Sequence, residues 1–207
     1  MDNGIGSFTV LDIARVFKAL NLKTKRSIEF VMFMGEEQGL LGSKAMAKKY
    51  AETGEIKNVK LMMNLDMVNN TMGFNASGND ELKAKMDELG ALIQKVDANY
   101  KNMNHNRAGL HSDHQPFMLK GVPVCNPSGS FPVKAYGCYH ANCDRIDLID
   151  KDQINNNVRF TAMMLYALAN MDELPAKFRS SEETRDFLIK QDLKKELVIG
   201  KDWHWEE

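Results

Sequence analysis

The sequence predicts an α/β protein in which helices cover a central sheet, and three observations support this fold class. First, residues 28–34 form a nearly continuous apolar run that stops at a glycine and two adjacent carboxylates, Glu36 and Glu37. Such a run is typical of a strand covered on both faces. Second, residues 59–68 repeat the pattern, with Asp66 near the carboxyl end. Third, segments with apolar residues at helical spacing alternate with these runs.

The chain opens in a loop and continues as a helix. Residues 2–7 are rich in Asp, Asn, Gly and Ser, and an apolar stripe at spacings of three, four and three follows through residue 20. A globular domain rarely begins in this way, so we expect a segment to be missing upstream. A polar turn at residues 23–26 leads into the first strand, and a helix from Gly42 ends near Gly54.

The remaining elements are read from the same patterns. The sequence predicts, in order, a short strand at 74–77, a helix at 79–96, a short strand at 100–103, a short helix that starts at 112–113 and ends at 121, a strand at 122–125, a loop at 127–139, a helix at 150–171, and a capped helix from 180 to about 197. Both tryptophans lie in the last five residues, and we expect them to pack back onto the protein.

Composition limits the function classes. With 207 residues and a formal net charge of -1, the chain fits one domain with an appendage and has no basic stripe for nucleic acid. The longest apolar run, residues 162–169, is far shorter than the roughly 20 residues of a membrane span. The first residues do not resemble a signal peptide. Three cysteines neither demand nor exclude one disulfide, so the compartment stays open.

The two glutamates after the first strand are candidates for chemistry. In open α/β sheets the ligand crevice lies beyond the carboxyl ends of the strands, which is where Glu36 and Glu37 fall. Because neighbouring side chains leave a strand in different directions, one can bind a metal while the other acts as a base. A solvated acidic turn is the alternative for an isolated pair.

Other metal-binding residue types also lie in loops or at the ends of predicted elements. Taken singly, each fits a capping or surface role as well as ligation; as a set, carboxylates and imidazoles suit zinc. The candidates are Asp2, Glu36, Glu37, Asp66, Asp113, His114 and His140.

Five motifs in order make the sequence similar to a known superfamily. They are Asp-Asn-Gly-Ile-Gly at 2–6, Met-Gly-Glu-Glu-Gln-Gly-Leu-Leu-Gly-Ser at 34–43, Asn-Leu-Asp-Met at 64–67, Ser-Asp-His at 112–114 and Tyr-His-Ala-Asn-Cys-Asp at 139–144. Over residues 2–172 the chain resembles the co-catalytic zinc aminopeptidases, which include bacterial leucyl-type aminopeptidases and plasma glutamate carboxypeptidase. The resemblance implies a three-layer α/β/α fold of the zinc-exopeptidase type, with a mixed, mostly parallel central sheet.

The resemblance also implies a role for each matching residue. Asp2 aligns with the carboxylate that bridges two zinc ions, Glu37 and His140 with ligands of one zinc, and Asp66 with a ligand of the other. Glu36 matches the general base. Further matches are Tyr139, a stabiliser of the tetrahedral intermediate in some members, and three substrate-pocket or supporting residues, Asp113, His114 and Asp144.

One part of the family pattern has no counterpart. The family carries a further histidine ligand in a His-x-Asp motif before the bridging aspartate, and this chain has no residues there. We therefore expect a carboxyl-terminal portion of such a peptidase, truncated at the N-terminus, with a partial catalytic domain at 1–174 and a helical extension at 175–207. This chain is expected to bind zinc weakly or at one site and to have little peptidase activity, and an uncovered sheet edge predicts a homo-oligomer.

Several alternatives stay open. An aminopeptidase or dipeptidase acting on peptides is the leading function, and glutaminyl cyclases and carboxypeptidase-like members share the scaffold. A structural zinc knuckle at Cys138, His140 and Cys143 is a second class. A non-catalytic binding or relic domain of the same fold is a third. Because family members are commonly secreted or periplasmic, the full-length parent is expected in one of those compartments.

Overall fold

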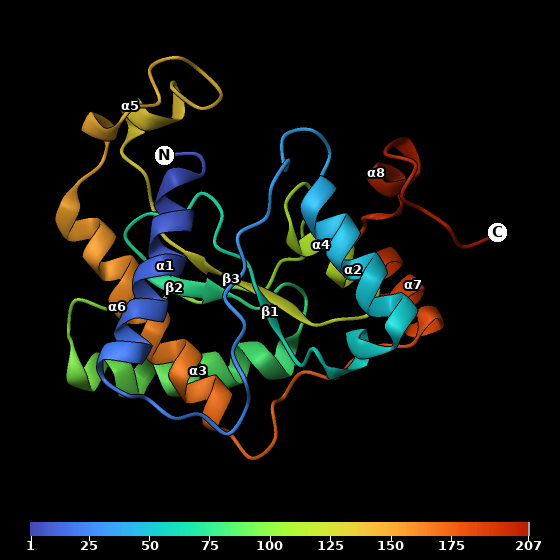
Figure 1. Cartoon of the computed structure of the whole chain (residues 1–207), viewed down its shortest axis with the longest axis horizontal. Coiled ribbons are helices and arrows are strands. Elements are labelled where there is room, and N and C mark those ends of the chain that lie inside the picture. Colours follow the sequence, from blue (N-terminus) through green and yellow to red (C-terminus); the bar gives the residue numbers. More distant parts are fainter. Residues whose placement is uncertain (207) are drawn as a thin grey trace.

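A small mixed sheet lies between two groups of helices in the computed structural model, which describes residues 1–206 (Figure 1). The strands are β1 (Met62–Met63), β2 (Gly73–Asn75) and β3 (Val124–Ser128). The helices are α1 (Gly4–Ala19), α2 (Leu41–Thr53), α3 (Asp80–Val96), α4 (His114–Met118), α5 (Val133–Tyr136), α6 (Lys151–Asn170), α7 (Ser181–Lys190) and α8 (Lys194–Ile199), with 3-10 turns η1 (Glu55–Asn58) and η2 (Ile146–Leu148).

The strand order is β1-β3-β2. β1 runs parallel to β3, with Met62 opposite Val124, and β2 runs antiparallel to β3, with Phe74 opposite Pro127. The mixed sheet expected from the sequence is confirmed.

The helices bury apolar faces on both sides of the sheet. α1, α3 and α6 lie on one side (Figure 1), where Met86 of α3 and Phe160 of α6 join a buried core with Phe74 of β2. α2, α4, α7 and α8 lie on the other side, where Phe117 of α4 and Leu188 of α7 pack in a second core. This arrangement gives the three layers expected of the fold class.

The strand predicted at residues 28–34 is wrong. This segment is extended but unpaired, and within the described residues no backbone-to-backbone hydrogen bond is made by residues 27–33. Its apolar side chains are correspondingly exposed, by 37% for Phe30 and 52% for Met32. The apolar pattern marks a segment suited to a sheet interior, but a strand also needs a neighbouring strand, and none pairs with it here.

Other boundaries differ for local reasons. Only Met62–Met63 of the predicted strand at 59–68 is paired. The strand predicted at 100–103 is absent, because Asn102 has a left-handed backbone (φ 55) and the bonds to the β2 region come from Met103 and His105. The predicted loop at 127–139 contains α5.

The helix predictions at 79–96 and 150–171 are confirmed by α3 and α6, and Ser180 forms the predicted capping box at α7. The helix predicted to run on to about 197 is instead broken into α7 and α8, where Asp192 has a φ of 58.

The carboxyl-terminal segment packs against the second core. Trp203 and Trp205 contact this cluster, and the Trp205 indole N–H donates a hydrogen bond to the Ser181 carbonyl oxygen at 3.1 Å. The division of the chain into a catalytic domain at residues 1–174 and a helical extension at residues 175–207 stays a prediction. None of the helices formed by residues 1–206 is both long and apolar enough to cross a membrane.

Candidate metal centre

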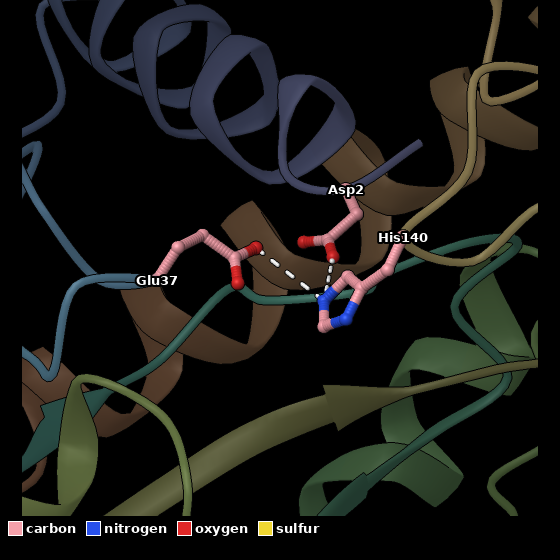
Figure 2. A group of neighbouring side chains, drawn as sticks. All are labelled: Asp2, Glu37 and His140. Atoms are coloured by element: carbon pink, nitrogen blue, oxygen red, sulfur yellow. Dashed lines mark ion pairs between the residues drawn. The ribbon is translucent and has the colours of Figure 1, made fainter.

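Three side chains from separate loops point toward one another (Figure 2). The His140 Nε2 atom lies 3.2 Å from an Asp2 carboxylate oxygen and 3.4 Å from a Glu37 carboxylate oxygen. One ligand atom from each of the three residues lies within 4.8 Å of the others. The structure thus brings together three of the four residues that the sequence predicts as metal ligands.

Glu37 is placed by a tight turn between the extended segment and α2. Gly35 has a φ of 70, which favours glycine, and it turns the chain away from the extended segment. The backbone N–H groups of Gly39 and Leu40 then donate to the Glu36 carbonyl oxygen at 2.9 and 2.8 Å. Both glutamates therefore sit on a short, internally bonded turn, and not at the end of a paired strand as the sequence predicted.

His140 lies in a loop closed by a disulfide. Cys138 and Cys143 are bonded to each other, and the Tyr139 ring stacks on the imidazole with 3.8 Å between centroids. His140 itself has a φ of 53, an uncommon conformation for a residue other than glycine. The crosslink restricts the freedom of the loop that presents this imidazole.

Asp2 is held through its backbone. Its N–H donates to the Asp144 carboxylate at 2.8 Å, which joins the loop of Asp2 to the loop of His140. The next residue, Asn3, caps α1 by accepting from the Gly6 N–H at 3.1 Å and donates to the Leu65 carbonyl oxygen at 3.0 Å. These bonds link three chain segments next to the site.

Asp66 lies near the three-residue group but is not part of it. Its carboxylate accepts a hydrogen bond of 2.6 Å from the Ser112 hydroxyl, which in turn accepts one of 2.7 Å from the Asn64 amide. Its charge is close enough to help raise the pKa of Asp2, although burial of Asp2 is the larger cause.

Glu36 has the most distinctive electrostatics of the site. Burial raises the pKa of its carboxyl group to about 7, with further contributions from the neighbouring charges of Asp66, Glu37, Asp113 and Asp2. A cation among these carboxylates would offset their charges and lower this pKa again. Among the described residues, the charges that shift the pKa of Glu36 are therefore all acidic.

The remaining predicted residues surround this cluster. Burial raises the pKa of Asp113, and one of its carboxylate oxygens is buried without a hydrogen-bond partner. His114 is held by its Nε2 atom, 3.0 Å from the Gly109 carbonyl oxygen, and by the Asn64 amide, and burial lowers its pKa. His114 is thus bonded within the protein rather than pointed into the three-residue group.

The donor set fits a zinc ion. Carboxylate oxygens and imidazole nitrogens are zinc ligands, and catalytic zinc sites use three protein ligands and leave a further position open for water. Sequence reasoning missed the supporting residues Asn3, Asn64 and Ser112, although each lies in a motif that it singled out. The amide and hydroxyl side chains next to the acidic residues in these motifs were the signal that could have identified them.

Comparison with known proteins identifies the family of this chain. A family model described as peptidase family M28 matches residues 1–165. The chain therefore belongs to peptidase family M28.

Similar proteins include exopeptidases of several organisms. Carboxypeptidase Q of Bos taurus is 25% identical over 175 residues, covering 84% of this chain and 36% of that protein. Probable leucine aminopeptidase 1 of Trichophyton verrucosum is 29% identical over 181 residues, covering 81% of this chain and 48% of that protein. A zinc aminopeptidase from Bacillus subtilis, as a solved structure, is 25% identical with a TM-score of 0.66, over 86% of this chain and 44% of that chain. The chain spans between a third and half of the length of these relatives.

Proposed function

We propose that this chain provides most of a zinc-dependent exopeptidase site, in which Asp2, Glu37 and His140 bind zinc and Glu36 is the general base. The observation that carries this proposal is the meeting of the three ligand atoms within 4.8 Å. The resemblance of the motifs and the membership of peptidase family M28 support it.

The proposed substrates are peptides with a free terminus. The similar proteins include carboxypeptidases and aminopeptidases, and an aminopeptidase or dipeptidase is the function that we propose for the whole protein. The motifs at 34–43 and 139–144 support this choice because they carry the residues that meet at the site.

The chain's own residues would act on the substrate as follows. Bound zinc would supply a water of lowered pKa and polarise the scissile carbonyl group. The Glu36 carboxylate takes a proton from the attacking water and later gives it to the leaving amine, as general acid-base catalysis requires. The Tyr139 hydroxyl, on a ring stacked against His140, is proposed to hydrogen-bond the tetrahedral oxygen.

The number of zinc ions is also a proposal. Asp2, Glu37 and His140 offer one compact set of donors, whereas Asp66 lies outside this set and already accepts the Ser112 hydrogen bond. We therefore propose one well-held zinc and a second, weaker position between Asp2 and Asp66. Because the described residues offer two ligands for this second position, we expect low activity from this chain.

The structure removes one alternative and leaves others as predictions. A zinc knuckle at Cys138, His140 and Cys143 is contradicted, because the two sulfur atoms are bonded to each other and are not thiolates. The homo-oligomer stays a prediction, as does an oxidising compartment, which a disulfide favours.

Glu36→Gln tests the proposed catalysis. With zinc supplied, we expect slow hydrolysis of leucine anilide, no hydrolysis of its N-acetylated form, and a loss of about 10²- to 10⁴-fold in rate in Glu36→Gln, because the base is removed. The rate is measured by absorbance of the released aniline.

Glu52→Gln, at an exposed position on α2, is the matched control and should keep the wild-type rate. Equal rates for Glu36→Gln and wild type would contradict the proposed role of Glu36. Complete inactivity of the zinc-loaded wild type would favour the alternative that the chain is a non-catalytic relic domain of the same fold.

A further inference from the structure

A small polar pocket lies beside the metal centre. It has a volume of about 150 Å³, and its walls come from β2, β3, the segment that follows β1 and the loop that precedes α4. Asp66 forms part of the wall, and its charge is close enough to the centre to act on Asp2 and Glu36. Apart from Gly109, each described residue that lines the pocket has a polar side chain. The pocket therefore favours a polar occupant over an apolar one.

Hydrogen bonds between the wall residues hold most of these side chains in place. The Asn64 amide donates to the Ser112 hydroxyl at 2.7 Å and lies 3.4 Å from the Nδ1 atom of His114. On the opposite strands, the Asn75 amide donates to the side-chain carbonyl oxygen of Asn126 at 3.2 Å. Because the wall is bonded within itself, its shape is set before a ligand enters.

Two polar groups of the wall remain open to the pocket. Ser77 is only 4% exposed, and within residues 1–206 its hydroxyl makes no hydrogen bond, although it is not sealed from the pocket. The Asn126 amide has two N–H groups, and within the same residues it makes one donation, to the Pro127 carbonyl oxygen at 3.2 Å. Since polar groups in such positions are usually hydrogen-bonded, a ligand atom would complete both.

The open groups select a particular kind of side chain. The Ser77 hydroxyl can donate or accept a hydrogen bond, and the free Asn126 N–H can donate one. A carboxamide or a hydroxyl group satisfies both, whereas methyl groups would leave both unpaired. A carboxylate would be repelled by the charge of Asp66 in the wall. Small, neutral, polar side chains are therefore the ones that fit.

We propose that this pocket receives the side chain of the substrate residue whose carbonyl group is attacked, and that Ser77 and Asn126 select asparagine, serine or threonine there over apolar residues. The inference rests on the proposed exopeptidase function, because the zinc site must hold the main chain of that residue. Asp66 belongs both to the pocket wall and to the surroundings of the zinc ligands, so one residue can reach both.

Asparagine hydroxamate and leucine hydroxamate are the probes that test this inference. Their side chains have nearly the same shape and differ in polarity, and the hydroxamate group binds zinc through oxygen without any bond being cleaved. Isothermal titration calorimetry of the zinc-loaded chain should show at least tenfold tighter binding of asparagine hydroxamate, because leucine leaves the wall groups unpaired. Binding of asparagine hydroxamate without hydrolysis of any anilide would contradict the proposed function and leave the selectivity of the pocket standing.

Two variants locate the selectivity. Asn126→Leu keeps the shape of the side chain and removes its amide, so asparagine hydroxamate should bind at least tenfold more weakly and leucine hydroxamate more tightly. Ser77→Ala should weaken asparagine hydroxamate binding several-fold and leave leucine hydroxamate unchanged. Asn99→Leu and Ser130→Ala, at exposed positions outside the pocket, are the matched controls and should bind both probes like the wild type.

The gain of leucine hydroxamate binding in Asn126→Leu also shows that this variant is folded. Equal affinity of the two probes in wild type, tighter binding of leucine hydroxamate, or no binding of either would overturn the proposal. So would a wild-type preference in both Asn126→Leu and Ser77→Ala, because the selectivity would then come from other residues.

Discussion

Asp144 supports the metal centre without belonging to it. It accepts a hydrogen bond from the Asp2 backbone and so connects residues 142 positions apart in the sequence. Asp2 and His140 come from the two loops that this bond joins, so its loss should let their donor atoms separate. The role of Asp144 in fixing the loops, predicted from its place four residues after His140, has a geometric basis here and stays a prediction.

Asp144→Ala should weaken zinc binding about tenfold, since groups that orient metal ligands typically contribute 10- to 100-fold to affinity. Competition with a zinc-sensitive dye measures this change. Asp147→Ala, an exposed carboxylate in the same loop region, is the matched control and should bind zinc like the wild type. An unchanged affinity in Asp144→Ala would show that the loops hold their positions without it.

Ser112 connects two other residues beside the site. Its buried hydroxyl accepts from Asn64 and donates to Asp66. Ser112→Ala should lower the free energy of unfolding by about 1–3 kcal/mol, because it leaves buried polar groups with fewer partners. Urea denaturation measures this loss. Ser130→Ala, at an exposed serine, should cost far less, and equal losses for both would contradict the account.

At the residue scale, the sequence could identify acidic and imidazole groups but not their partners. Asp2, Glu37 and His140 lie in separate motifs, and only the order of those motifs indicated that they meet. The hydrogen bonds of Ser112 could not be predicted, because the atoms involved are 46 and 48 positions apart in the chain. The disulfide was left open for the same reason, since three cysteines allow more than one outcome.

Helix α6 positions the loop that follows Asp66. Its buried Asn157 accepts from both the backbone N–H and the hydroxyl of Thr71, at 2.9 and 3.0 Å, and donates to the Val68 carbonyl oxygen at 3.0 Å. One side chain thus satisfies three polar groups of this loop, which lies against the helix without strand pairing of its own.

Asn157→Ala should lower the free energy of unfolding by about 2–4 kcal/mol, because several buried groups lose their partner at once. Chemical denaturation followed by circular dichroism measures the effect. Asn155→Ala, on the exposed face of the same helix, is the matched control and should change stability by less than about 0.5 kcal/mol. Similar losses in the two variants would mean that helix propensity, not the hydrogen bonds, decides the result.

At the element scale, helices were predicted better than strands. The hydrogen bonds of α3 and α6 form within each segment, so the apolar spacing and the capping residues suffice to place them. A strand needs a partner from elsewhere, and residues 28–34 have the composition of a strand without such a partner. The same difference explains why only two residues of the predicted strand at 59–68 are paired.

At the scale of the whole molecule, helices lie on both sides of the mixed sheet (Figure 1). The fold class could be predicted because alternating apolar runs and amphipathic helices specify it. The lack of strand pairing at residues 28–34 could not be predicted, because pairing depends on whether a neighbouring strand is present.

The central claim is that Asp2, Glu37 and His140 hold zinc, and zinc stoichiometry tests it most directly. Wild type, Glu37→Ala, His140→Ala and the exposed-histidine control His204→Ala are loaded with zinc, desalted and measured by elemental analysis. The account predicts about one firmly held zinc per chain in wild type and in the control, and its loss from the other two variants. A wild type that retains no zinc, or variants that keep it, would contradict the account.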